Sequence, residues 1–320
     1  MRILQRLGCE IVPFDTTRWV SGGKRLSRFL AHRLNSGHSV VSMNRALQLF
    51  GSSLNSISHI WIDKGRWIYP DTLFDLKRST SATLVHYTPD PQLLLHRSRH
   101  FNVCIPLYDL LVTTKSYEMK RYKALGAKSI LLVLQGYDDR FYPVIPTPVT
   151  KAELESDICF IGHCERHYAR RLRVTESIGK RLKIWGPGWK RYSFFNSWAH
   201  GHVAGDGIWG KHYPLALASS KIGLGLLSKR VPETTTTRSF EIPAMGLFLL
   251  AERTAEHLEL FQEGVEAEFF SNDEELRDKI IYYIGNDSAR EKISHAGYKR
   301  CLASGYQSQK QLRKVLKQIV

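Results

Sequence analysis

Two charged residues three positions apart, Arg238 and Glu241, stand where a predicted helix begins after a buried apolar strand. A carboxylate at such a junction can accept two hydrogen bonds from the vicinal hydroxyls of a ribose, and a guanidinium can clamp a pyrophosphate with two parallel hydrogen bonds. The amino end of a helix adds its own preference for anions. The alternative is that Glu241 only stabilises the helix dipole from the first turn. The spacing by itself leaves both interpretations open.

Glycine follows two further predicted strands of the same half, Gly162 after the run DICFI and Gly186 after the run LKIW. Because glycine has no Cβ, its backbone can approach a phosphate or a base closely. Neither glycine belongs to a G-x-G-x-x-G fingerprint, so an ordinary turn is the competing interpretation. Three arginines follow Gly162: Arg166, Arg170 and Arg171. Their guanidiniums suit a diphosphate, and the alternative is that they face water.

The elements that must position these residues alternate between short apolar runs and helical patterns, which is typical of α/β proteins with parallel sheets. The first half predicts strands over residues 9–14, 38–43, 59–63, 82–87, 109–114 and 129–134, and helices over 44–51, 70–79 and 116–126. The second half predicts strands with glycine turns over 157–163 and 182–189, and strands over 221–227, 247–252 and 267–271. Helices separate these strands, and two terminal helices follow over 289–305 and 306–320.

A proline-rich segment divides the two series of strands. Residues 141–157 contain Pro143, Pro146 and Pro148 and then polar residues, which predicts an interdomain linker. We therefore expect two Rossmann-like, doubly wound domains over residues 1–150 and 151–320, facing each other across a cleft. Ligands of such sheets bind beyond the carboxyl ends of the strands, at the topological switch points.

The composition narrows the class of protein further. A hydrophobic fraction of 43% with 14 Phe, 14 Tyr and 7 Trp excludes a disordered chain. No window is apolar enough for a membrane-spanning helix, and the amino terminus lacks the apolar core of a secretory signal, so we expect a cytoplasmic protein. Five scattered cysteines without a C-x-x-C motif predict reduced thiols, with no metal site and no disulfide framework.

Positive charge is concentrated in the first half of the chain. Lys and Arg outnumber Asp and Glu by 46 to 30, a net charge of +16, and no acid lies between Asp15 and Asp63. Within that stretch, residues 22–35 combine an apolar helical stripe with arginines, a pattern of helices that lie on anionic membranes. An ordinary surface helix with its stripe inward is the alternative. Motifs of nucleic-acid binding are absent from the sequence, so we expect no nucleic-acid partner.

Ordered blocks of the second half resemble the CgeB-like, spore-maturation-protein-like glycosyltransferases. The blocks are FIGHCERHYARRL, IWGPGW, YPLALASSKIGLGLL, RSFEIPAMGLFLLAERTAEHLELFQEGVEAEFF and EELRDKIIYYI. A looser match covers the first half through LGCEIVPFD, ATLVHYTPDP and YDLLVTTK. The resemblance implies a GT-B fold with an acceptor-side domain over 1–150 and a nucleotide-sugar donor domain over 151–320.

For this sequence the resemblance implies transfer of a sugar from a nucleoside-diphosphate sugar to an acceptor hydroxyl, in the synthesis of glycans or surface polysaccharides. No metal and no further cofactor are expected. The resemblance identifies Glu241 as the ribose-binding carboxylate and Arg238 as a contact for the donor diphosphate. The remaining donor-site residues that we expect are Gly162, Arg166 and Gly186.

The expected catalytic residues depend on the stereochemistry of the transfer. Glu233 lies eight positions before Glu241, which is the E-x7-E spacing of retaining transferases of this fold, and such an enzyme needs no dedicated base. An inverting enzyme needs a general base. His86 and Asp90 are the candidates, because they lie at the carboxyl end of a predicted strand of the first half. For His86 an ordinary half-buried histidine is the alternative.

Members of the resembled family usually begin with a strand and a glycine-containing loop before the helix that leads into L-G-x-E-V. This sequence begins at MRILQRLG, so we expect either a missing first strand or a start upstream of Met1. The acceptor is expected to be a glycan, a lipid-linked molecule or a protein, with peripheral contact at the inner face of an anionic membrane. Two hypotheses compete with the transferase: a nucleotide-sugar-binding protein without turnover, and a nucleic-acid-binding protein driven by net charge.

Overall fold

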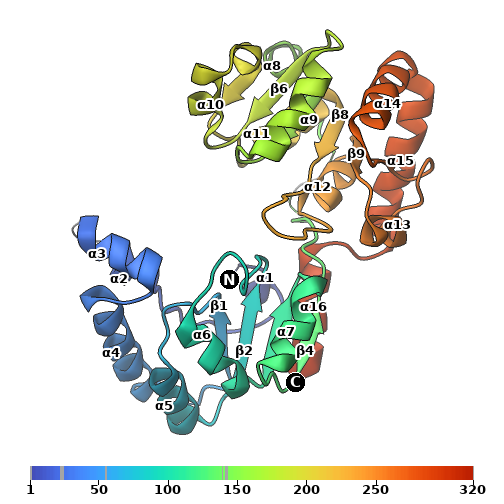
Figure 1. The fold of residues 1–320 in the computed structure, drawn as a ribbon. Coiled ribbons are helices and arrows are strands. Elements are labelled where there is room, and N and C mark those ends of the chain that lie inside the picture. Colours follow the sequence, from blue (N-terminus) through green and yellow to red (C-terminus); the bar gives the residue numbers. More distant parts are fainter. Residues whose placement is uncertain (1, 22–24, 55, 139, 141–142, 320) are drawn as a thin grey trace. The chain divides into compact units, whose positions relative to one another are not determined.

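The computed structural model describes residues 2–21, 25–54, 56–138, 140 and 143–319. The chain divides into two compact units. Unit 1 comprises residues 1–134 and 312–320, and unit 2 comprises residues 135–311. Each unit is an α/β domain around one parallel sheet (Figure 1).

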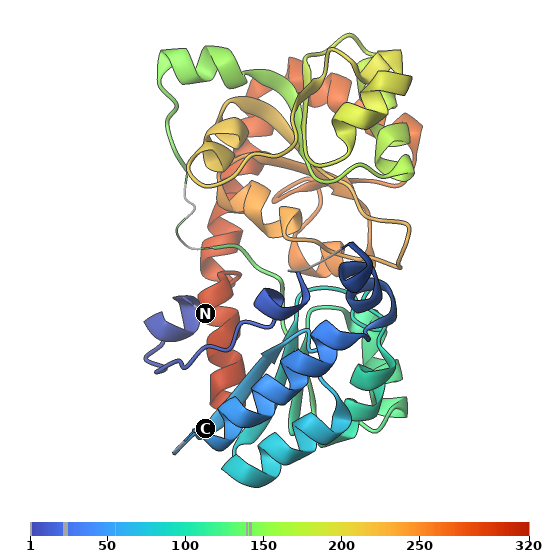
Figure 2. The ribbon, with the colours of Figure 1, turned by 90° about the vertical axis from the view of Figure 1, so that its left-hand side faces the viewer.

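Unit 1 is built on a four-stranded sheet in the order β1-β2-β3-β4. Its strands are β1 (His59–Asp63), β2 (Thr83–Thr88), β3 (Leu110–Thr113) and β4 (Ile130–Leu132). Its helices are α1 (Arg2–Arg6), α2 (Thr17–Val20), α3 (Arg25–Phe29), α4 (His38–Ser52), α5 (Pro70–Thr80), α6 (Arg99–Cys104), α7 (Met119–Ala124) and the greater part of α16 (Ser308–Ile319). Helices α4 and α5 lie side by side along the sheet (Figure 2). Every residue of β3 is buried, as in strands covered by helices on both faces.

Unit 2 is built on a six-stranded sheet in the order β10-β9-β8-β5-β6-β7. Its strands are β5 (Ser156–Ile161), β6 (Leu182–Trp185), β7 (Val203–Gly205), β8 (Ser220–Gly225), β9 (Phe248–Glu252) and β10 (Glu268–Phe270). Its helices are α8 (Pro148–Leu154), α9 (Arg166–Glu176), α10 (Trp189–Phe195), α11 (His212–Ala218), α12 (Arg238–Ala244), α13 (Ala255–Leu260), α14 (Asp273–Gly285) and α15 (Asp287–Ala303). The chain adds strands outward from β5 and then from β8, so the switch point of this doubly wound sheet lies between those two strands.

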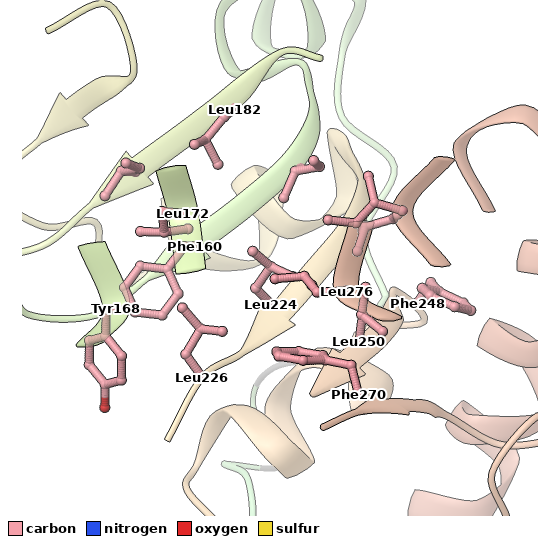
Figure 3. Close-up of a cluster of buried hydrophobic side chains, with 14 of the residues drawn as sticks. Phe160, Tyr168, Leu172, Leu182, Leu224, Leu226, Phe248, Leu250, Phe270 and Leu276 are labelled. Atoms are coloured by element: carbon pink, nitrogen blue, oxygen red, sulfur yellow. The ribbon is translucent and has the colours of Figure 1, made fainter. Parts of the chain in front are cut away.

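The core of unit 2 lies on one face of this sheet. Phe160, Leu224, Leu250 and Phe270 come from four strands and gather in one buried cluster (Figure 3). Helices α9 and α14 add Leu172 and other side chains to the cluster. This packing fixes the strands whose carboxyl ends carry the loops of the candidate site.

One strand that the apolar pattern predicts forms a helix instead. Residues 38–43 begin α4, which buries Val40, Met43 and Leu47 at spacings of three and four residues. This spacing is the helical one, and it runs through the predicted strand into the predicted helix that follows. The pair Val40–Val41 favours a strand only locally, and the longer helical pattern prevails.

The segment over residues 9–14, also predicted as a strand, has no regular structure. Within the described sheet β1 therefore has a single neighbour, β2. A groove of 1950 Å³ runs along β1, and its walls include Ile11, Phe14, Ile60 and Leu316. The sheet of unit 1 is thus open at this edge.

The division into units differs from the predicted boundary at residue 150. Unit 2 begins at Gln135, and the last turns of α16 return to unit 1. Val315 is fully buried there with Val85 and Val112, because α16 presents an apolar face to the sheet. Of the predicted linker, residues 141–142 lie outside the described residues, and α8 occupies its second half.

The basic segment over residues 22–35 is described from Arg25 onward, and the side chains of Arg25 and Leu26 lie outside the description. It forms α3 and then a π-helical turn over Leu30–Leu34. Two residues of its apolar stripe are exposed, Phe29 at 54% and Leu34 at 59%. The alternative of an ordinary surface helix with its stripe inward is therefore wrong for these two residues.

Candidate functional site

The candidate site is the carboxyl edge of the unit 2 sheet, where the loops after β5, β6, β8 and β9 meet. The loops after β5 and β8 flank the switch point, which is the ligand position of doubly wound sheets. The loops after β5, β8 and β9 contribute polar side chains, and the loop after β6 packs against the loop after β5 at Gly186. Helices α9, α10, α11 and α12 add further contacts at this edge.

Glu241 lies in the first turn of α12 and is half-buried. The Tyr213 hydroxyl of α11 donates a hydrogen bond to its Oε2 atom at 2.6 Å. Burial raises the pKa of Glu241, the Tyr213 hydrogen bond and the Arg238 charge lower it in part, and Asp138 raises it again. The carboxylate is therefore half-buried and hydrogen-bonded to a side chain of a different helix.

Arg238 differs from the expectation of a guanidinium that faces an open phosphate site. Its Nη2 donates to the Leu226 carbonyl at 2.6 Å and its Nη1 to the Ile161 carbonyl at 3.3 Å. The guanidinium also lies over the rings of Phe160 and Tyr168, at 5.2 and 5.7 Å from their centroids. The side chain therefore joins the ends of β5 and β8, and it supports Glu241 through its charge.

Gly162 and Gly186 serve the contact between two loops. A Cβ on Gly186, whose φ is +151°, would lie 1.9 Å from the Gly162 carbonyl oxygen. That oxygen also accepts a hydrogen bond from Trp189 Nε1 at 2.8 Å. Loop packing explains Gly186, and a Cβ on Gly162 would lie 2.8 Å from the Phe160 ring and 2.9 Å from Arg238 Nη1. The predicted approach of both glycines to a ligand stays a prediction.

The three arginines after Gly162 separate into two groups. Arg170 and Arg171 are ion-paired with Asp273 at the start of α14. Arg166 is the first residue of α9 and is exposed. Of the three, Arg166 is therefore the one placed for an anion at the amino end of an eleven-residue helix.

A second carboxylate network at this edge escaped the sequence analysis. Glu165, the residue before α9, is buried and accepts hydrogen bonds from Ser228 Oγ at 2.8 and 2.9 Å. His163 Nε2 lies 2.7 Å from the same carboxylate and its side chain is half exposed. Glu233 belongs to this region too, since its Oε2 accepts the Ser228 backbone N–H at 3.2 Å. An acid directly before a predicted helix was the signal available for Glu165.

Glu252, the last residue of β9, forms the adjoining network. Lys229 Nζ lies 2.7 Å from its Oε2, and His167 Nε2 lies 3.0 Å from its Oε1. The Leu227 backbone N–H donates to the same Oε1 atom at 2.9 Å. Burial opposes ionisation here, but the Lys229 and Leu227 hydrogen bonds prevail and lower the pKa of Glu252. The edge therefore combines ionised carboxylates with exposed cationic side chains.

The candidate bases lie in unit 1. His86 is fully buried, with its ring 4.7 Å from that of Phe101 and 5.3 Å from that of Tyr108. Its Nε2 lies 3.2 Å from the Lys64 carbonyl, and burial lowers the pKa of His86 to about 3. A general base has to reach its substrate, so the structure corrects the expectation that His86 faces an acceptor.

Asp90 follows β2 and is partly exposed. Its carboxylate lies 3.5 Å from His96 Nε2 and 2.5 Å from Lys64 Nζ. These partners, His96 first, lower the pKa of Asp90. The structure therefore leaves Asp90 accessible, as a base must be, but in an ion-paired form.

The described residues contain no group of three or more His, Cys, Asp or Glu side chains placed to hold a metal ion. Within the same residues, no helix has both the length and the apolar character of a membrane span.

The fold defines a class: the chain has the two-domain GT-B fold of glycosyltransferases. Residues 166–317 match the family model described as glycosyl transferase-like. No curated protein matches the chain in sequence.

Solved structures resemble the whole fold. Sucrose-phosphate synthase from Thermosynechococcus elongatus has a TM-score of 0.65 at 13% identity, covering 88% of this chain and 78% of that chain. A glycosyltransferase from Rickettsia africae has a TM-score of 0.63 at 14% identity, covering 93% and 87%. HepE from Anabaena, in complex with UDP and glucose, has a TM-score of 0.63 at 12% identity, covering 86% and 81%. At these identities the likeness is one of fold.

Proposed function

We propose that this protein transfers a sugar from a nucleoside-diphosphate sugar to an acceptor hydroxyl in glycan or surface polysaccharide synthesis, as a CgeB-like transferase. The observation that carries the proposal is Glu241: a half-buried carboxylate on the first turn of α12, beside the switch point, inside the matched family domain. A carboxylate there can accept hydrogen bonds from both hydroxyls of a ribose. The complexes of HepE with UDP and with UDP-glucose support a nucleotide-sugar donor for this fold.

The departing diphosphate needs positive charge and N–H donors. The amino end of α9, with exposed Arg166, lies at the same sheet edge as Glu241. Half-exposed Lys229 extends this cationic surface, and half-exposed His163 adds a ring nitrogen beside it. Preorganised donors of this kind stabilise a leaving group by about 3 kcal/mol each, so the proposed mechanism uses no metal.

We assign the proposed catalytic carboxylates to Glu233 and Asp90. Glu233, held by the Ser228 N–H, is the proposed contact to the donor sugar of a hexosyl transfer. Asp90 is the proposed acceptor of the hydroxyl proton if the reaction inverts, because it is accessible and His86 is not. The protein requires no further cofactor in this mechanism.

The test is the replacement of Glu241 by glutamine. Nucleotide binding, screened by thermal shift and then titrated with UDP, ADP and GDP, should weaken about 100-fold, since two hydrogen bonds to a charge are lost. Sugar transfer should fall with it, while the melting temperature without ligand stays unchanged. Glu274→Gln, at an exposed position of α14, is the matched control. Wild-type affinity in Glu241→Gln would remove the proposal. Nucleotide-sugar binding without transfer to any acceptor would favour the non-catalytic binding protein.

We also propose that the acceptor is a lipid-linked or membrane-borne glycan, approached from the cytoplasmic face through unit 1. Exposed Phe29 and Leu34 stand beside exposed Arg28 and Arg33, in a stretch without acids. Apolar side chains next to arginines match the interface of an anionic bilayer, where the former insert and the latter attract lipid headgroups.

Vesicle co-sedimentation tests this surface. The wild type should sediment with vesicles of anionic phospholipid and not with zwitterionic ones, and Phe29→Ser with Leu34→Ser should lose the binding. Phe74→Ser is a matched control, because Phe74 is 53% exposed but lies on α5 between Asp71 and Asp75. Equal sedimentation of the wild type and the double variant would refute the membrane surface.

A further inference from the structure

The hydrogen bond between Tyr213 and Glu241 joins two elements that are separate in sequence. Tyr213 lies in the first turn of α11, ahead of β8, and Glu241 lies in the first turn of α12, behind it. Both side chains are half-buried, and the hydroxyl lies 2.6 Å from Oε2. A bond this short is typical of a hydroxyl that donates to an ionised carboxylate.

Other charged groups face the same carboxylate. Arg238 lies one turn earlier on α12 and acts on Glu241 with a positive charge, while Asp138, ion-paired with Arg140, acts with a negative one. Burial and Glu241 raise the pKa of Tyr213 well above its usual range, so the phenol keeps its proton and remains a donor. Tyr213 is thus the group that contacts the carboxylate directly, and Arg238 acts through its charge.

We propose that Tyr213 is a positioning residue of the donor site, which holds Glu241 ionised and oriented so that it can bind the two ribose hydroxyls. The inference rests on the proposed function and extends it to a residue outside the expected site. A carboxylate has about four acceptor positions. Within the part of the chain that the structure describes, Tyr213 takes one of them on Oε2, and Oε1 and the second position of Oε2 remain for two hydroxyls.

The same bond sets the pH range in which the site binds. Burial raises the pKa of Glu241, and the Tyr213 donor opposes that rise. Without the donor, the carboxylate takes up its proton at a higher pH. Because the protonated acid is a poorer acceptor for two hydroxyls, nucleotide binding then disappears at a pH where the wild type still binds.

Tyr213→Phe tests the proposal, because phenylalanine keeps the ring and removes the hydroxyl. We expect UDP, ADP and GDP, titrated calorimetrically, to bind about 10-fold more weakly, which is the loss of one hydrogen bond to a charged group. The acid limb of the binding profile should also move to higher pH. Tyr192→Phe is the matched control, since that ring packs against Trp189 and Trp198 away from Glu241.

A 2′,3′-dideoxy nucleotide separates positioning from general structural support. The wild type should prefer each nucleoside diphosphate over its dideoxy analogue, and Tyr213→Phe should reduce that preference. In a double-mutant cycle the effects of Tyr213→Phe and Glu241→Gln should not add, because both act on one contact. A variant that only loosened the fold would weaken both nucleotides equally and keep the pH midpoint.

The outcomes distinguish this proposal from the proposed function. Wild-type binding with unchanged affinity, pH midpoint and dideoxy preference in Tyr213→Phe overturns the role of Tyr213 and leaves the transferase intact. A wild type that binds none of the three nucleotides overturns both. If Tyr213→Phe does not fold, Glu241→Gln tests the proposal instead. The acid limb of its nucleotide-binding profile should disappear, and a profile that keeps this limb overturns the proposal.

Discussion

Two carboxylates, Glu118 in unit 1 and Glu241 in unit 2, differ in how many hydrogen bonds the fold supplies to them. Glu118 in unit 1 is 2% exposed and accepts three backbone N–H groups, from Gln92 at 3.0 Å, Leu93 at 2.8 Å and Leu94 at 3.1 Å. Glu241 in unit 2 is half-buried, and the hydrogen bond described for it comes from Tyr213. Glu118 is satisfied by its own fold, whereas among the described residues the Tyr213 hydroxyl leaves acceptor positions of Glu241 for the proposed ligand. The proposed binding role of Glu241 depends on this difference in the number of internal donors.

The largest effect on stability is expected when Glu118 is replaced by alanine. Three N–H groups of residues 92–94 then lose a buried acceptor, which lowers the free energy of unfolding by about 4 kcal/mol. Urea unfolding measures the loss, with Glu274→Ala as the exposed control. Under conditions where the variant is folded, nucleotide affinity should stay within about twofold. A variant as stable as the wild type would contradict the structural role of Glu118.

Gly186→Ala should have the next largest effect, in unit 2. The added Cβ meets the Gly162 carbonyl oxygen at 1.9 Å, and a φ of +151° is strained for alanine. We expect a loss of about 3 kcal/mol in the free energy of unfolding, because two backbone loops must separate. Gly201→Ala, where a Cβ would meet open space, is the control. If Gly186→Ala is stable but fails to bind nucleotide, the glycine serves the ligand instead of the loop contact.

His86→Phe should change how stability depends on pH. The pKa of His86 is about 3 when folded and 6.5 in its ordinary state, so between these values the unfolded chain binds a proton that the folded chain does not. Wild-type stability therefore falls as pH drops from 6.5 towards 3, by at most about 1.4 kcal/mol per pH unit from this residue. Phenylalanine removes that contribution, which is about 2 kcal/mol at pH 5.

Urea titrations of both proteins from pH 7 to pH 4 isolate the difference. Parallel stability curves would mean that the imidazole of His86 is solvated, contrary to its burial. They would also restore His86 as a candidate base.

Sequence patterns predicted most of the strands because a buried parallel strand is a local signal. The runs that became β2, β3, β5, β8 and β9 are short, apolar and bounded by polar residues. The same signal was wrong for residues 38–43, where Val40 and Val41 belong to a longer helical pattern. Residues 9–14 have strand-like composition, yet the described sheet gives them no partner strand.

The site was predictable only in part, since its contacts cross the sheet. The position of Glu241 at a strand–helix junction follows from spacing, and the structure agrees with it. Its partner Tyr213 lies 28 residues away in the sequence, and local periodicity does not predict a contact over that distance. Arg238 illustrates the reverse, because its position suits a phosphate while tertiary packing turns its guanidinium to two carbonyl oxygens. Burial of His86 likewise depends on rings brought from α6 and its neighbouring turn.

Asp90→Asn is expected to have the smallest effect on stability. It tests whether an acid of unit 1 takes part in the chemistry. Asp90 and Lys64 are more than a third exposed, so their ion pair contributes less than about 1 kcal/mol to folding. If Asp90 accepts the proton of the acceptor hydroxyl, kcat should fall about 100-fold or more while the donor affinity of unit 2 stays unchanged. Asp75→Asn, ion-paired with Arg78 on α5, is the control. A normal kcat in Asp90→Asn would show that the ion pair is structural and would favour a retaining reaction, in which Glu233 and the diphosphate suffice without a base.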